Sequence, residues 1–246
     1  MSIWDSIEQK ISLSIDRDFE LKKQTAVPGG DINQAYRIEG VVEQEALSFF
    51  IKLNQKSLLD MFEAEAEGLE EIESSQAIHV PHVVCTGVAD NQSYLILENQ
   101  NFGSGASDSA TRLGQQLALL HKTTSPQFGW SLNNTIVSTP QVNNYESSWI
   151  DFWQQHRLGF QLELARQKGA SDALYTKGKE LSAELEQLFI GYQPQASLLH
   201  GDLWSGNYAY LNNAEPVIYD PAVYYGDRET DIAMTELFGG FSAEFY

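Results

Sequence analysis

Hydrophobic residues in the first hundred positions follow two different periods. Isoleucines recur at every fourth position from Ile3 to Ile15, which predicts a first helix over residues 3–15. The residues that follow instead form short apolar runs separated by turn-forming residues, a pattern typical of strands. We predict strands in KKQTAV (22–27), AYRIEG (35–40), LSFFIKL (47–53), VPHVVCTG (80–87) and SYLILE (93–98). Between the third and fourth of these strands, apolar residues at helical spacing predict an inserted helix over residues 57–73.

The pattern changes again after the Gly- and Ser-rich segment NQNFGSGASDS, which we interpret as a hinge or linker. Apolar residues at helical spacing then predict helices in residues 109–124, 145–169 and 171–189, with Ser109 and Ser171 placed to act as N-caps. The resulting prediction is an α+β protein with two lobes. A β-rich N-terminal lobe with one inserted helix takes residues 1–98, and a mainly helical C-terminal lobe takes residues 99–246.

The composition restricts the partners of such a protein. The chain has 15 Lys and Arg against 34 Asp and Glu, a formal net charge of −19, so we expect neither nucleic acid nor an anionic membrane as main partner. A phosphorylated ligand would have to be held locally, by a metal ion, backbone N–H groups or a well-placed lysine. The single cysteine, Cys85, excludes an internal disulfide, and we find neither a signal peptide nor a membrane-spanning apolar stretch. We therefore expect a cytoplasmic protein.

The segment HGDLWSGN concentrates residues that carry chemistry. Asp202 and Asn207 are five positions apart, and Asp220 ends the apolar run PVIYD thirteen positions later. Together with His200 and Leu203, they fit the protein-kinase pattern H-R-D-L-x-x-x-N followed by an aspartate. In that chemistry one carboxylate orients the attacking hydroxyl, while the amide oxygen and the second carboxylate hold Mg²⁺ against the phosphates. The alternative is structural, with turn residues, a strand cap and a core histidine, but four matches in order favour the catalytic interpretation.

A lysine in an apolar strand supplies an independent test. Alternation in LSFFIKL places Lys52 on one face with Phe50, where an unpaired charge would be costly to bury. Glu65 lies inside the apolar stripe of the following helix, between Phe62 and Leu69. We therefore expect Lys52 and Glu65 to form an ion pair rather than Glu65 to be part of a solvated acidic face.

Two further segments are candidates for nucleotide contacts. Gly29 and Gly30 in PGGDIN would let backbone N–H groups approach phosphates, although two adjacent glycines also mark an ordinary hairpin turn. Backbone groups near Glu98 and Gln100, at the start of the hinge, could pair with an adenine edge. Trp204, inside HGDLWSGN, is either a substrate contact or a buried anchor.

Several blocks in order resemble the fructosamine kinase (ketosamine-3-kinase) family. These are VPGGDINQAYRI, FFIKLN, MFEAEAEGL, LGQQLALLH, HGDLWSGN and DPAVYYGDRETDIAMTELFGGF. The resemblance covers nearly the whole chain and implies a protein-kinase-like fold similar to that of aminoglycoside phosphotransferases and choline kinases. It also implies ATP- and Mg²⁺-dependent phosphorylation of the sugar part of ketoamines, usually at the 3-hydroxyl, a step in deglycation.

Residue by residue, the resemblance implies that Asp202 is the catalytic base, that Asn207 and Asp220 bind Mg²⁺, and that Lys52 with Glu65 positions the ATP phosphates. Asp231 and His200 would be structural supports of the catalytic loop.

Two departures qualify the resemblance. Gly201 stands where a regulated protein kinase has arginine, and no A-P-E motif follows Asp220, so we expect a small-molecule or protein-linked ketoamine substrate rather than a protein docked through an activation segment. The alternatives are a kinase for an aminoglycoside or choline-like compound and a nucleotide-binding module without activity. The module without activity is an alternative because only 26 residues follow Asp220. A chain truncated there would lack helices that the family has.

Overall fold

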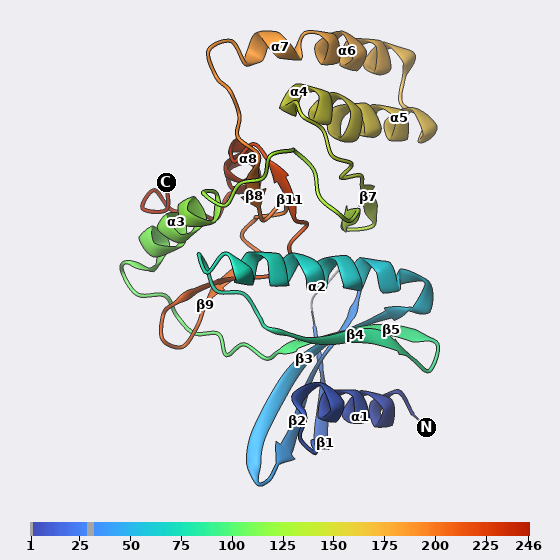
Figure 1. The fold of residues 1–246 in the computed structure, drawn as a ribbon, viewed down its shortest axis with the longest axis vertical. Helices are drawn as coiled ribbons and strands as arrows, with labels where there is room; N and C mark the ends of the chain where they lie inside the picture. The colour runs from blue at the N-terminus through green and yellow to red at the C-terminus, as the bar shows by residue number, and fades with distance from the viewer. Residues whose placement is uncertain (1, 29–31) are drawn as a thin grey trace.

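The structure is a computed structural model that describes residues 2–28 and 32–246 (Figure 1). The N-terminal part contains α1 (Ile3–Ile15), β1 (Glu20–Val27), β2 (Gln34–Val42), β3 (Glu45–Gln55), the 3-10 turn η1 (Lys56–Leu58), α2 (Leu59–Ser74), β4 (Val83–Ala89) and β5 (Gln92–Glu98). The rest contains α3 (Ser109–Leu120), β6 (Asn134–Ile136), β7 (Thr139–Gln141), α4 (Trp149–Phe152), the π-helical turn η2 (Trp153–Leu158), α5 (Gly159–Gln167), α6 (Asp172–Ala183), α7 (Leu185–Leu188), β8 (Ser197–Leu199), β9 (Tyr208–Tyr210), β10 (Pro216–Ile218), β11 (Tyr224–Gly226) and α8 (Glu229–Phe238).

The N-terminal strands form one antiparallel sheet in the order β1-β2-β3-β5-β4, whose two faces have different roles. On one face, alternate residues of β3 pack with the buried isoleucines of α1, which lies beside the sheet in Figure 1. On the other face, Phe50 packs toward the second core and Lys52 lines a cavity. The alternation that we predicted for β3 is therefore confirmed, and it separates a purely apolar surface from a functional one.

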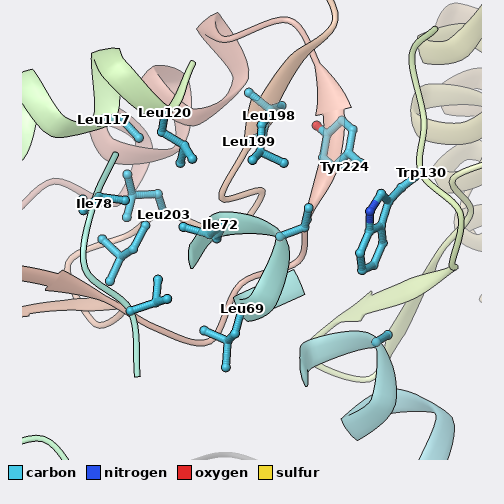
Figure 2. Packing of buried hydrophobic residues seen from close by; sticks show 14 of the residues in the cluster. Leu69, Ile72, Ile78, Leu117, Leu120, Trp130, Leu198, Leu199, Leu203 and Tyr224 are labelled. Atoms are coloured by element: carbon cyan, nitrogen blue, oxygen red, sulfur yellow. The ribbon is translucent and has the colours of Figure 1, made fainter. Parts of the chain in front are cut away.

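A second hydrophobic core joins α2 to the C-terminal part of the chain. Figure 2 shows Leu69 and Ile72 of α2 near residues of α3 and β8. Leu203, from the predicted catalytic segment, belongs to this core and is fully buried. The loop that carries Asp202 is thus fixed to the core by an apolar side chain in its middle.

The α+β prediction is confirmed, with a five-stranded sheet followed by a mainly helical part. Ser171 caps α6 as predicted, its hydroxyl accepting from the backbone N–H of Leu174. The N-cap prediction for Ser109 is wrong, because Ser109 is the first residue within α3 and its hydroxyl donates to the carbonyl of Ala214. The hydroxyl thus joins α3 to the β9–β10 hairpin instead of capping the helix.

The predicted long helices are interrupted. Residues 145–169 give α4, a π-helical turn and α5, and residues 171–189 divide into α6 and α7. The β6–β7 hairpin was not predicted at all. No helix in residues 2–28 or 32–246 combines the length and apolar character needed to cross a bilayer.

Candidate active site

One cavity of about 720 Å³ collects most of the predicted site residues. It is lined on one side by the sheet and α2 and on the other by the HGDLWSGN segment and the residues around Asp220. The predicted residues that line it are Lys52, Glu65, Glu98, Gln100, Trp204, Asp202, Asn207 and Asp220. His200 and Asp231 lie buried behind this wall, and Gly29 and Gly30 fall outside the described residues.

Lys52 forms the predicted ion pair and a second one. Its Nζ lies 2.6 Å from Glu65 Oε1 and 2.7 Å from Asp220 Oδ1, and the residue is only 6% exposed. Burial by itself would lower the pKa of Lys52, but the two carboxylates outweigh this cost and raise the pKa. Burial raises the pKa of Glu65 to about 7, the charge of Lys52 opposes that rise, and the negative charge of Asp220 adds to it. Lys52 therefore remains a cation that ties α2 to the end of the PVIYD strand.

Asp202 lines the cavity and has a raised proton affinity. Its backbone N–H donates to Nδ1 of His200 at 3.2 Å, and the side-chain amide of Asn207 lies 3.3 Å from its Oδ2. Partial burial raises the pKa of Asp202 to about 6, with further contributions from the negative charges of Asp220 and Asp231. At neutral pH the group is a carboxylate, yet it accepts a proton more readily than an exposed aspartate does.

Asp231 fixes the loop backbone from α8. Its carboxylate accepts from the backbone N–H groups of His200 and Gly201, both at 2.9 Å, and lies 2.9 Å from Nε2 of His121. Burial alone would raise the pKa of Asp231, but the hydrogen bond and charge of His121, with the loop contacts, lower it. The predicted supporting position of Asp231 is thus observed, and His121, at the end of α3, is a partner that the sequence did not reveal.

His200 and Gly201 maintain the conformation of the loop, His200 through hydrogen bonds and Gly201 through its backbone. Burial lowers the pKa of His200, so the ring is neutral; Nδ1 accepts from Asp202 N–H and Nε2 lies 3.0 Å from the Tyr219 carbonyl, to which it donates. Gly201 has φ of +82°, and a Cβ there would lie 2.0 Å from the carbonyl oxygen of Ala222. The glycine is therefore required by this backbone, in the position where a regulated protein kinase has arginine.

Asn207 and Asp220 have the donor chemistry of a magnesium site. The Nδ2 of Asn207 donates to the Asp202 carbonyl at 2.8 Å, which leaves its side-chain oxygen for a cation. Asp220 has a left-handed backbone, φ 57°, and a side chain that is 45% exposed on the cavity. Mg²⁺ commonly takes one or two protein oxygens and completes its shell with water and phosphate. No group of three or more His, Cys, Asp or Glu suited to a metal occurs in the part of the chain that is described.

The structure shows the surroundings of Glu98 and Gln100 at the hinge and of Trp204. The backbone N–H of Glu98 already donates to the His82 carbonyl at 2.9 Å, so it is engaged within the protein. The Gln100 side chain donates to the carboxylate of Glu98 at 3.1 Å. Trp204 is 40% exposed, so the alternative that it is a buried anchor is wrong. It lines the cavity instead, with its ring centroid 6.2 Å from that of Phe238.

One part of the cavity wall was not predicted from the sequence. Asn134, Thr135 and Val137, from the unpredicted β6–β7 hairpin, line the same cavity as Asp202 and Trp204. Their strands are three residues long, too short for a period to be recognised. His121 ends the block LGQQLALLH. Its contact with Asp231 could not be predicted, because a single histidine at a helix end carries no pattern that identifies its partner.

Comparison with known proteins gives consistent results. The model of the family described as fructosamine kinase matches residues 3–246. A probable ketoamine kinase of Synechocystis is 48% identical, over 99% of this chain and 80% of the relative. The crystal structure of a putative fructosamine-3-kinase from Haemophilus somnus superposes with a TM-score of 0.87 at 29% identity, covering 99% of this chain and 80% of that one.

A more distant structure is similar in fold alone. It is the ternary complex of an aminoglycoside phosphotransferase with streptomycin and ATP, with a TM-score of 0.55 at 12% identity, covering 94% of this chain and 75% of that one. The kinase-like fold expected from the sequence is therefore confirmed.

Proposed function

The chain belongs to the fructosamine kinase family, and from this premise we propose that it transfers the γ-phosphoryl group of ATP to the 3-hydroxyl of the sugar part of a ketoamine. It is a kinase with an alcohol group as acceptor, and family membership implies ATP as the donor. The observation that carries the proposal is the convergence of Lys52, Asn207, Asp202 and Asp220 on one cavity.

Asp202 is proposed as the residue that receives the acceptor's proton. Its carboxylate lines the cavity and has a pKa of about 6, while the hydrogen bonds to His200 and Asn207 hold the loop in place. A base of this strength is ionised at neutral pH and is well matched to a hydroxyl that becomes acidic only as the phosphoryl bond forms.

Lys52 and Glu65 are proposed to position the nucleotide phosphates. The ammonium group is held by Glu65 from α2 and by Asp220, so it presents a fixed positive charge in a chain of net charge −19. Asn207 and Asp220 would hold Mg²⁺, which when bound neutralises charge on the phosphate oxygens. The glycines Gly29 and Gly30 stay a prediction for backbone contacts to the phosphates.

The remaining assignments follow the same arrangement. Residues 1–98 would form the nucleotide-binding lobe and residues 99–246 the catalytic and substrate lobe. Glu98 and Gln100 line the cavity and are proposed to lie near the adenine, while Trp204 is proposed to contact the ketoamine. A cytoplasmic location is proposed, because the single cysteine is compatible with a reducing compartment.

An acceptor panel tests the proposal. ATP consumption would be measured with magnesium and a fructosamine, a ribulosamine, an aminoglycoside and choline, with Asp202→Asn as the control. We expect consumption that depends on a ketoamine and on Asp202. Preferential transfer to the aminoglycoside or choline, or nucleotide binding without transfer to any ketoamine, would contradict the proposed function.

A further inference from the structure

The β6–β7 hairpin, residues 134–141, forms a wall of the cavity that the proposed chemistry leaves without a role. Asn134, Thr135 and Val137 line the cavity together with Asp202 and Trp204. β6 contacts α2, and in Figure 1 β7 lies beside α2, between this helix and α5. The hairpin is therefore placed beside the helix that carries Glu65, at the cavity that Asp202 and Trp204 also line.

Buried amide groups fix the base of the hairpin to the residues that follow Asp220. Nε2 of Gln141 donates to the Ala222 carbonyl at 3.2 Å, and Nδ2 of Asn134 donates to the Val223 carbonyl at 2.8 Å. The backbone N–H of Ala222 in turn donates to the His200 carbonyl at 2.9 Å. One residue, Ala222, thus bonds the hairpin on one side and the catalytic loop on the other.

The network continues into the helical part and makes the wall rigid. The side-chain amide of Asn143 donates to Asn134 Oδ1 at 3.2 Å, and Arg157 donates to Asn143 Oδ1 at 2.8 Å. The guanidinium group of Arg157 also stacks 4.1 Å above the ring of Tyr224. An ordinary surface hairpin with three-residue strands does not need three buried amides and a stacked arginine to hold it in place.

The tip of the hairpin is strained where it borders the cavity. Val137 has φ of +55°, a left-handed conformation that is a genuine outlier for a β-branched residue, and its side chain is 54% exposed. Such strain persists where the surrounding structure over-determines it, often at ligand-binding positions.

The chain after Asp220 leaves the acceptor side of the site to another segment. β11 pairs with β8 directly, and α8 begins at Glu229, so residues 221–228 form no extended activation segment. A protein kinase uses such a segment to present its substrate. The hairpin occupies the neighbouring position, bonded to the same residues 222–223.

We propose that the β6–β7 hairpin is the acceptor-specificity wall, in which Thr135 hydrogen-bonds a hydroxyl of the ketoamine and Val137 packs against its carbon chain, together with Trp204. This inference rests on the proposed function, because it names the residues that select its acceptor. Thr135 is half-buried on the cavity, which suits a hydroxyl that exchanges water for a sugar oxygen.

Steady-state kinetics of matched variants tests the wall. Thr135→Val removes the hydroxyl, Thr135→Ser retains it, and Thr139→Val makes the same change on the strand that lines a separate, smaller cavity. We expect Thr135→Val to raise the acceptor KM about three- to tenfold, the value of one hydrogen bond, with the ATP KM unchanged. Thr135→Ser and Thr139→Val should remain near wild type.

Val137→Gly is a second variant that does not depend on Thr135. Glycine suits the left-handed backbone, so the fold should persist while the acceptor KM rises about threefold or more. The wall is refuted if neither Thr135→Val nor Val137→Gly changes the acceptor KM, or if the ATP KM rises in the same proportion. If the wild type uses another hydroxyl compound instead of a ketoamine, the proposed function fails, and the same variants assayed with that compound still decide the role of the hairpin.

Discussion

The part of the cavity wall that follows residue 133 has two sides that are built from different chemistry. The catalytic side, His200–Asp220, depends on ionised groups: Asp231 holds two loop N–H groups, and Asp220 shares Lys52 with Glu65. The hairpin side, residues 134–141, depends on neutral amides that donate to backbone carbonyls. The charged groups of the catalytic side change the pKa values of their neighbours. The amides of the hairpin side fix the position of the hairpin.

This difference separates proton transfer and phosphate binding from acceptor selection, although both sides are bonded to Ala222. Charge on the catalytic side serves proton transfer and phosphate binding, so it should respond to pH. Amides on the hairpin side do not titrate in the physiological range, so acceptor selection should be insensitive to pH.

Asp202→Asn should cause the largest loss. Removing the base should lower kcat about 10²–10⁴-fold, because an amide cannot take the acceptor's proton. The ATP affinity, measured by calorimetry, should stay near wild type, since Lys52 is bonded to Glu65 and Asp220 rather than to Asp202. Near-normal phosphoryl transfer by this variant would show that the base is elsewhere.

Asp231→Asn should cause the largest loss of stability. The buried carboxylate accepts three hydrogen bonds, so replacing its charge with an amide should cost about 3 kcal/mol or more in the free energy of unfolding, because each hydrogen bond to a charged group contributes about 1.5–3 kcal/mol. Denaturant unfolding measures this value. A loss below about 1 kcal/mol would mean that these three contacts of the Asp231 carboxylate do not stabilise the fold.

Gln141→Met should have a smaller effect, on the hairpin side alone. The variant keeps the side-chain volume but removes the donor to Ala222 and to Asn134 Oδ1, which should cost about 1–3 kcal/mol of unfolding free energy. The acceptor KM should rise, while the pH at which activity is half-maximal should not move. A shifted pH profile would contradict the separation of the two sides.

The pH dependence of the wild type should report Asp202. Below its pKa of about 6 the carboxyl group is protonated and cannot accept a proton, so activity falls as pH falls. Relative to pH 7, kcat/KM at pH 5 should be about tenfold lower, as expected for one ionisation. A flat profile across this range, after a check that the fold is intact, would exclude Asp202 as the titrating base.

Sequence reasoning reached the catalytic side and missed the hairpin side for physical reasons. Lys52 was recognisable because a charge in an apolar strand needs a partner, and helical spacing then selected Glu65. The second bond, from Lys52 to Asp220, joins residues 168 positions apart, and no local pattern encodes such a contact. Motif order still brought Asp202 and Asp220 into one site.

The hairpin is stabilised by tertiary contacts rather than by local preference. Its strands are short, and Asn134 and Gln141 would be assigned to a polar loop because their carbonyl partners lie more than eighty positions away. Trp204 shows the same limit, since its exposure depends on neighbours such as Phe238 that the loop sequence does not reveal.

The most direct test of the account is to identify the product. Wild-type protein would be incubated with magnesium, ATP and a ribulosamine or fructosamine of lysine, and the phosphate would be located by phosphorus–proton NMR correlation. We expect phosphate on the sugar 3-hydroxyl with the wild type and none with Asp202→Asn. Phosphate on another position or another acceptor, or bound ATP with no phosphorylated ketoamine, would contradict it.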